Sequence, residues 1–137
     1  MANDAHEMLV FLRLALISQQ KGQLLPRDKF LILSAVAALK AGYPDVADAC
    51  RRHVTQNQPS HLLARFRNLS EAMVDAEFQP YLRALRKFCS FEQAEHLLQN
   101  TADAATTVSL DTERDEYECA DIARGILADA AWQSPDL

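Results

Sequence analysis

Apolar residues recur every three or four positions wherever the chain shows a regular pattern, which is the spacing of α-helices that bury one face. The pattern predicts helices over residues 4–20, 26–41, 44–56 and 61–77, a short helix from Pro80, another from Phe91 and a last one from about Asp111. Residues 100–110 and the chain from residue 133 show no such pattern. We predict a flexible loop for the first stretch and a loose tail for the second.

These elements predict an all-α fold that forms a single domain over residues 1–137. A chain of this length can build one substantial hydrophobic core but not two. About six to seven helices would pair as antiparallel hairpins, in a compact helical bundle or a short helical-repeat-like array.

The helix over 28–41 is predicted to lie at the centre of the fold. From Phe30 onward it is apolar on nearly every side, with Ser34 as the main break, and a helix of this kind has to be covered all round. Gly42 and Pro44 follow it. Glycine accepts the left-handed conformation of a helix end, and proline suits the first position of the next helix.

Composition favours a cytoplasmic protein. Hydrophobic residues make up 49% of the chain and charged residues 24%, as in ordinary globular proteins. The longest apolar run, residues 8–17, is too short to span a bilayer, and Asp4 and Glu7 precede it where an export signal would carry basic residues. The three cysteines lie far apart, which favours reduced, buried thiols over disulfides. We predict a cytoplasmic location with no membrane segment and no cofactor.

Two helix pairs share a common pattern. The stretch "ALKAGYPDVADACRRHVTQNQP" places Gly42 at a turn, Ala47 where two helices would touch, and Pro59 at the end. It resembles a tetratricopeptide helix pair, and residues 84–99, "ALRKFCSFEQAEHLLQ", repeat the pattern without the glycine and the proline. The Trp-Leu-Gly signature of the first helix is absent from both. The resemblance implies stacked helical hairpins that bind a protein or peptide on a concave face.

The cysteines and histidines allow two kinds of site chemistry. Cys50 and His53 lie three residues apart on one predicted helix, and with His61 they could begin a zinc site. A zinc site needs three or four ligands and no second pair has suitable spacing, so we predict packing roles and no metal. A nucleophilic pair of Cys50 or Cys89 with His53, His61 or His96 stays open, because such partners meet in space and not in sequence.

Charge is unevenly spread along the chain. Residues 51–87 contain seven basic and three acidic residues, whereas residues 88–137 contain two basic and eleven acidic ones. Arginines from three consecutive predicted helices could form one basic surface, and we predict that a partner binds to Arg51, Arg52, Arg65, Arg83 and Arg86. The alternative is that the acidic start of the last helix packs across these arginines.

Helical architecture without a recognisable catalytic motif favours a non-catalytic protein-interaction module, an adaptor or regulator whose partner has an acidic surface. Two alternatives stay open: a small Cys/His-dependent enzyme or thiol sensor, and a nucleic-acid-binding regulator that uses residues 51–87. Nucleic acid is the less favoured ligand because the net charge is −5 and no glycine loop is evident. Long leucine- and alanine-rich faces are compatible with a homodimer.

Overall fold

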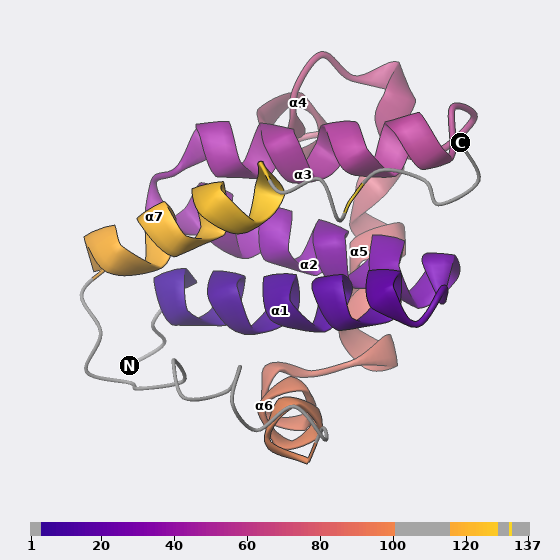
Figure 1. Ribbon diagram of the computed structural model, residues 1–137. Coiled ribbons are helices and arrows are strands. Elements are labelled where there is room, and N and C mark those ends of the chain that lie inside the picture. The colour runs from indigo at the N-terminus through magenta and orange to yellow at the C-terminus, as the bar shows by residue number, and fades with distance from the viewer. Residues whose placement is uncertain (1–3, 101–115, 129–131, 133–137) are drawn as a thin grey trace.

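The computed structural model describes residues 4–100, 116–128 and 132 (Figure 1). The helices are α1 (Asp4–Gln20), α2 (Leu24–Ala41), α3 (Pro44–Asn57), the 3₁₀ helix η1 (Leu62–Arg65), α4 (Leu69–Met73), α5 (Phe78–Phe88), α6 (Phe91–Gln99) and α7 (Glu116–Leu127). Over these described ranges there is no strand, which confirms the all-α prediction. The predicted start of the last helix, the predicted loop beyond residue 100 and the predicted tail lie outside the described residues.

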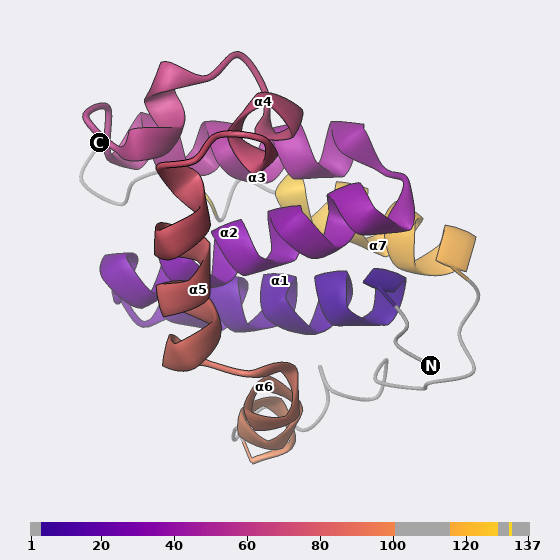
Figure 2. The same cartoon turned by 180° about the vertical axis from the view of Figure 1, so that it is seen from behind.

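Three antiparallel helices form the centre of the fold, with α2 packed between α1 and α3 (Figure 1). Helix α7 packs on α1 and α3, helix α6 on α1, and helix α5 runs across α2 (Figure 2). Helix α2 begins at Leu24, two residues before its predicted start, and every residue from Phe30 to Ala38 is buried. The Ser34 hydroxyl donates a hydrogen bond to the Met8 carbonyl of α1 at 2.7 Å. The prediction that α2 is the central helix is therefore confirmed.

Gly42 makes the tight turn between α2 and α3. Its φ is +93°, in the left-handed region that side chains with a Cβ disfavour. Its N–H donates to the Leu39 carbonyl at 3.1 Å, and the Tyr43 N–H donates to the Ala38 carbonyl at 2.9 Å. Pro44 is the first residue of α3, as predicted, where its missing N–H costs no hydrogen bond.

The prediction of one helix over residues 61–77 is wrong. The chain forms η1 and then α4, and Phe66 and Asn68 between them have extended backbone. Arg51 of α3 holds this break in place, because its guanidinium donates to the Phe66 carbonyl at 3.2 Å and to the Arg67 carbonyl at 2.9 Å. A contact from another helix therefore satisfies carbonyls that a continuous helix would have used internally.

Side chains within the segment also start its two separate turns. His61 Nδ1 accepts a hydrogen bond from the Leu63 N–H at 3.0 Å, and Asn68 Oδ1 accepts one from the Glu71 N–H at 2.9 Å. Each contact satisfies a free N–H at the start of a helical turn. Local capping therefore favours two short elements over one long helix.

Helix α5 begins at Phe78, two residues before the predicted Pro80, whereas α6 begins at Phe91 as predicted. Ser90 and Gln93 form the predicted capping box: Ser90 Oγ accepts from the Gln93 N–H at 3.2 Å, and the Ser90 N–H donates to Gln93 Oε1 at 2.9 Å. Helix α6 lies across the direction of α5 and not along it (Figure 2). The second tetratricopeptide-like pair therefore departs from the side-by-side hairpin that the resemblance implied.

Candidate functional site

The five predicted partner-binding arginines fall into two groups. Arg51 holds the break before α4, and Arg65 Nη1 lies 2.7 Å from Glu77 Oε2. The other three are exposed and have no ion pair within the described residues: Arg52, Arg83 and Arg86. The ion pair between α7 and α3 joins Arg124 to Asp45 at 2.8 Å and involves none of the five. Their joint role in binding stays a prediction.

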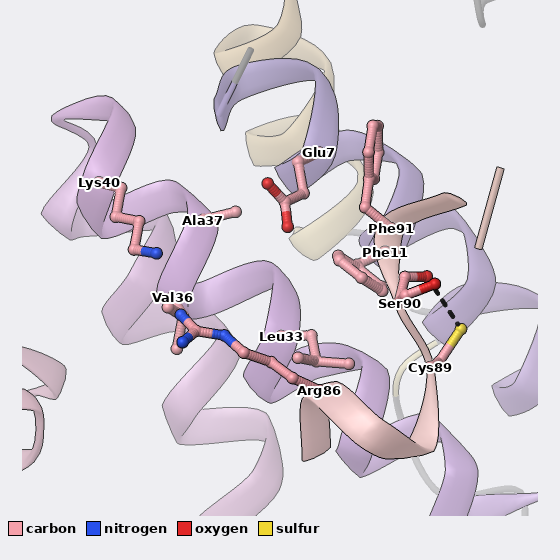
Figure 3. A pocket seen from close by; sticks show the side chains of 10 residues that line it. All are labelled: Glu7, Phe11, Leu33, Val36, Ala37, Lys40, Arg86, Cys89, Ser90 and Phe91. Atoms are coloured by element: carbon pink, nitrogen blue, oxygen red, sulfur yellow. Dashed lines mark hydrogen bonds between the residues drawn. The ribbon is translucent and has the colours of Figure 1, made fainter. Parts of the chain in front are cut away.

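Arg86 lines a small pocket of about 160 Å³ (Figure 3). We call it the Glu7 pocket after the carboxylate that also lines it. Antiparallel packing places the first turns of α1 beside the last turns of α2, and the corner between α5 and α6 closes the space. Ten residues line it: Glu7, Phe11, Leu33, Val36, Ala37, Lys40, Arg86, Cys89, Ser90 and Phe91.

One carboxylate and two cations face the Glu7 pocket. Figure 3 shows Glu7 on the α1 side, with Lys40 and Arg86 on the opposite side. Burial, followed by the nearby Asp4, raises the pKa of the Glu7 carboxyl, and the two cations lower it by less. Within the described residues none of these three groups forms an ion pair. Each of the three charges therefore lacks direct contact with an opposite charge.

A wider groove of about 440 Å³ shares Cys89 with the Glu7 pocket, and we call it the α5–α6 groove. Its lining residues are Phe30, Phe88, Cys89, Glu92, Gln93, His96 and Leu97. Phe88 is 41% exposed and Leu97 is 47% exposed, although both are large apolar residues. The Lys29 ammonium lies 4.6 Å from the centre of the Phe88 ring. The groove therefore combines open apolar surface with a nearby cation.

The geometry does not favour thiol chemistry. All three cysteines are buried, and burial raises the pKa of the Cys50 thiol to about 12 and also raises the pKa of Cys89. Two of the predicted histidine partners contact other groups: His53 Nε2 contacts the Leu127 carbonyl at 3.2 Å, and His61 Nε2 contacts the Tyr81 hydroxyl at 3.0 Å. The third, His96, lines the α5–α6 groove together with Cys89, and its Nε2 contacts Asn100 Nδ2 at 3.0 Å. In the part of the chain that the structure describes, no three metal-ligating side chains come together.

A buried polar network lies at the end of α1 and α2 that is opposite to the Glu7 pocket. The sequence did not predict it. Arg27 and Asp28, in the first turns of α2, are 4% and 2% exposed. Arg27 donates to Asp28 Oδ1 at 2.9 and 2.7 Å, while Asn57 and Gln58 donate to Asp28 Oδ2 at 2.9 and 2.5 Å. Arg27 Nη1 also donates to Gln19 Oε1 of α1 at 2.6 Å.

These five groups join the end of α1, the start of α2 and the end of α3. The signal in the sequence is the pair of adjacent polar residues at each of two helix ends, "RD" and "NQ". Both Asp28 oxygens already have donors. The network is therefore structural, and the open charged groups lie at the other end, in the Glu7 pocket.

The pH dependence of stability tests the environment of Glu7. Its pKa is raised above the ordinary value of 4.5 in the folded state, so the folded chain keeps a proton that the unfolded chain has lost. This stabilising contribution is lost as pH rises through the raised value. We expect the melting temperature of Glu7→Gln, relative to the wild type, to increase between about pH 4 and about pH 7. Circular dichroism melts check this with Glu92→Gln as the matched control, and a constant difference would contradict it.

No helix of the described part of the chain is both long and apolar enough to cross a membrane. In comparisons with family models, curated proteins and solved structures, nothing matches this chain.

Proposed function

We propose that this protein is a non-catalytic interaction module, a cytoplasmic adaptor or regulator that binds an acidic and partly apolar segment of a partner protein. The segment lies in the α5–α6 groove and extends past Cys89 to the Glu7 pocket. The observation that carries the proposal is the open apolar surface of Phe88 and Leu97 beside cations that have no ion pair within the described residues. An apolar groove with a charged rim is a common way to hold a peptide.

Charge around the groove favours an acidic segment. Arg83, Arg86 and Lys87 are exposed and lie at three- and four-residue spacing, so they share one face of α5. Lys29 and Lys40 add two exposed cations from α2. The carboxylates that line the pocket and the groove are those of Glu7 and Glu92. The lining residues balance, with the cations Lys40 and Arg86 against these two carboxylates. The surrounding cations Lys29, Arg83 and Lys87 would therefore supply the attraction for an acidic segment and speed its association.

The cysteines support a non-catalytic role. A nucleophilic cysteine works as the thiolate, and a raised pKa together with burial suppresses that form. Cys50 and Cys89 have both properties, and Cys119 is 1% exposed. We therefore favour binding over thiol-dependent catalysis.

Selection from a phage-displayed library of random short peptides tests the proposal. We expect the selected peptides to combine Asp or Glu with aromatic or aliphatic residues. Leu97→Glu and Arg86→Glu should each weaken binding of a selected peptide by about tenfold or more, as measured by fluorescence anisotropy. The matched controls are Val74→Glu, which changes an 87% exposed apolar residue outside the groove, and Lys21→Glu, in the turn directly after α1 and about 20 Å from Glu7 along the helix direction.

Three results would overturn the proposal. The first is selection of peptides without acidic residues, and the second is equal loss of binding in the control variants. The third is concentration-dependent dimerisation that Leu97→Glu abolishes, since a second copy of the chain would then occupy the groove. A loss caused by Arg52→Glu but not by Arg86→Glu would move the site to α3.

A further inference from the structure

We infer that the Glu7 pocket receives one carboxylate of the partner segment between Lys40 and Arg86, and that Glu7 takes up a proton when this carboxylate binds. Affinity for the partner then rises as pH falls. This inference rests on the proposed function and adds a ligand class and a pH response to the same surface.

The size of the pocket fits one side chain. Its volume is about 160 Å³, and a cavity of about 150 Å³ holds a molecule as small as benzene. Pockets for whole drug-sized ligands are about 300–1,000 Å³. Phe11, Val36 and Phe91 provide apolar wall, suited to the methylene groups of a glutamate side chain. The rest of the segment would lie in the neighbouring α5–α6 groove, which shares Cys89 with the pocket.

The charge of the pocket suits an anionic group. Lys40 and Arg86 provide two positive charges and Glu7 one negative charge, which leaves one positive charge to be neutralised while Glu7 is ionised. A carboxylate supplies that one negative charge.

Proton uptake follows from placing a second carboxylate near Glu7. Two carboxylates in one site cannot both ionise freely, so one of them holds a proton to higher pH. Glu7 is already predisposed to this, because burial and Asp4 on its own helix raise its pKa. The groups that face it from the other elements are Lys40, Arg86 and Cys89. Glu95 of α6 pairs with His6 at 3.3 Å.

Nuclear magnetic resonance titration with N-acetyl-L-glutamate α-amide tests the inference, with N-acetyl-L-glutamine amide as the neutral control. We expect the glutamate probe to shift the resonances of pocket residues and the glutamine probe to have no effect. The association constant should rise as pH falls from about 8 to about 5.5, with a limit of tenfold per pH unit for one proton. In Glu7→Gln the pH dependence should disappear, with binding at about pH 8 at least as tight as in the wild type.

Lys40→Met and Arg86→Met should each weaken probe binding by about tenfold or more. The inference is overturned if millimolar glutamate probe leaves the pocket resonances unchanged, or if its affinity is the same at both pH values. It is also overturned if Glu7→Gln keeps the pH dependence. The proposed function stands in these cases provided that selected peptides still require Leu97. If the probe behaves as expected and no peptide binds, the proposed function fails and the carboxylate site remains.

Discussion

Asp28→Ala is expected to lower the free energy of unfolding by about 3–5 kcal/mol, the range found when one partner of a buried ion pair is removed. The change leaves the Arg27 guanidinium, in a residue that is 4% exposed, without the carboxylate that accepts two of its hydrogen bonds. Asn57 and Gln58 lose their acceptor at the same time. The start of α2 and the end of α3 therefore lose their common hydrogen-bond acceptor.

Urea denaturation followed by circular dichroism measures this effect. The matched control is Asp121→Ala, because Asp121 also pairs with an arginine, at 3.1 Å, but its side chain is 76% exposed. Exposed ion pairs contribute little to stability, so the control should unfold almost as the wild type does. Adding Arg27→Met to Asp28→Ala should recover part of the loss, since the unpaired charge is then removed as well. An equally small effect of both single changes would show that the network does not stabilise the fold.

The sequence predicts the central helices well because their signals are local. A run that is apolar all round identifies α2 as the buried helix, and Gly42 with Pro44 marks the turn after it. Residues 61–77 carry an equally regular apolar pattern, yet they form two short elements. The reason is partly tertiary, since Arg51 from α3 binds the carbonyls at the break. Val74, an apolar residue within this pattern that directly follows α4, is 87% exposed.

The candidate site was only partly predictable for the same reason. Arg83 and Arg86 share one face of α5, and their spacing along the chain indicates this directly. Glu7, Lys40 and Cys89 come from three distant parts of the chain and meet only because α1 and α2 are antiparallel and α6 turns away from α5. The spacing of these three residues along the chain does not show that they line one pocket. For Arg51 the sequence was misleading. Its place in a run of basic residues predicts a partner-binding side chain, whereas in the fold its guanidinium donates to the Phe66 and Arg67 carbonyls.

Phe11→Ala is the second change with a large expected effect, about 3–5 kcal/mol for truncating a buried phenylalanine. Phe11 is 1% exposed, and its ring centre lies 6.4 Å from that of Phe30 and 6.3 Å from that of Phe91. It therefore joins α1 to both α2 and α6. Because Phe11 also lines the Glu7 pocket, water can enter the enlarged space, and we expect a loss near the lower end of this range.

Phe88→Ala is the matched control, since it removes the same ring from a residue that is 41% exposed. It should cost about 1–2 kcal/mol in urea denaturation, because part of the Phe88 surface already contacts water although its ring centre lies 5.5 Å from that of Phe30. The same variant should weaken a peptide selected for the α5–α6 groove, whose wall Phe88 forms. A loss of stability as large as that of Phe11→Ala would mean that Phe88 belongs to the core. The groove would then lack the spare apolar surface on which partner binding depends.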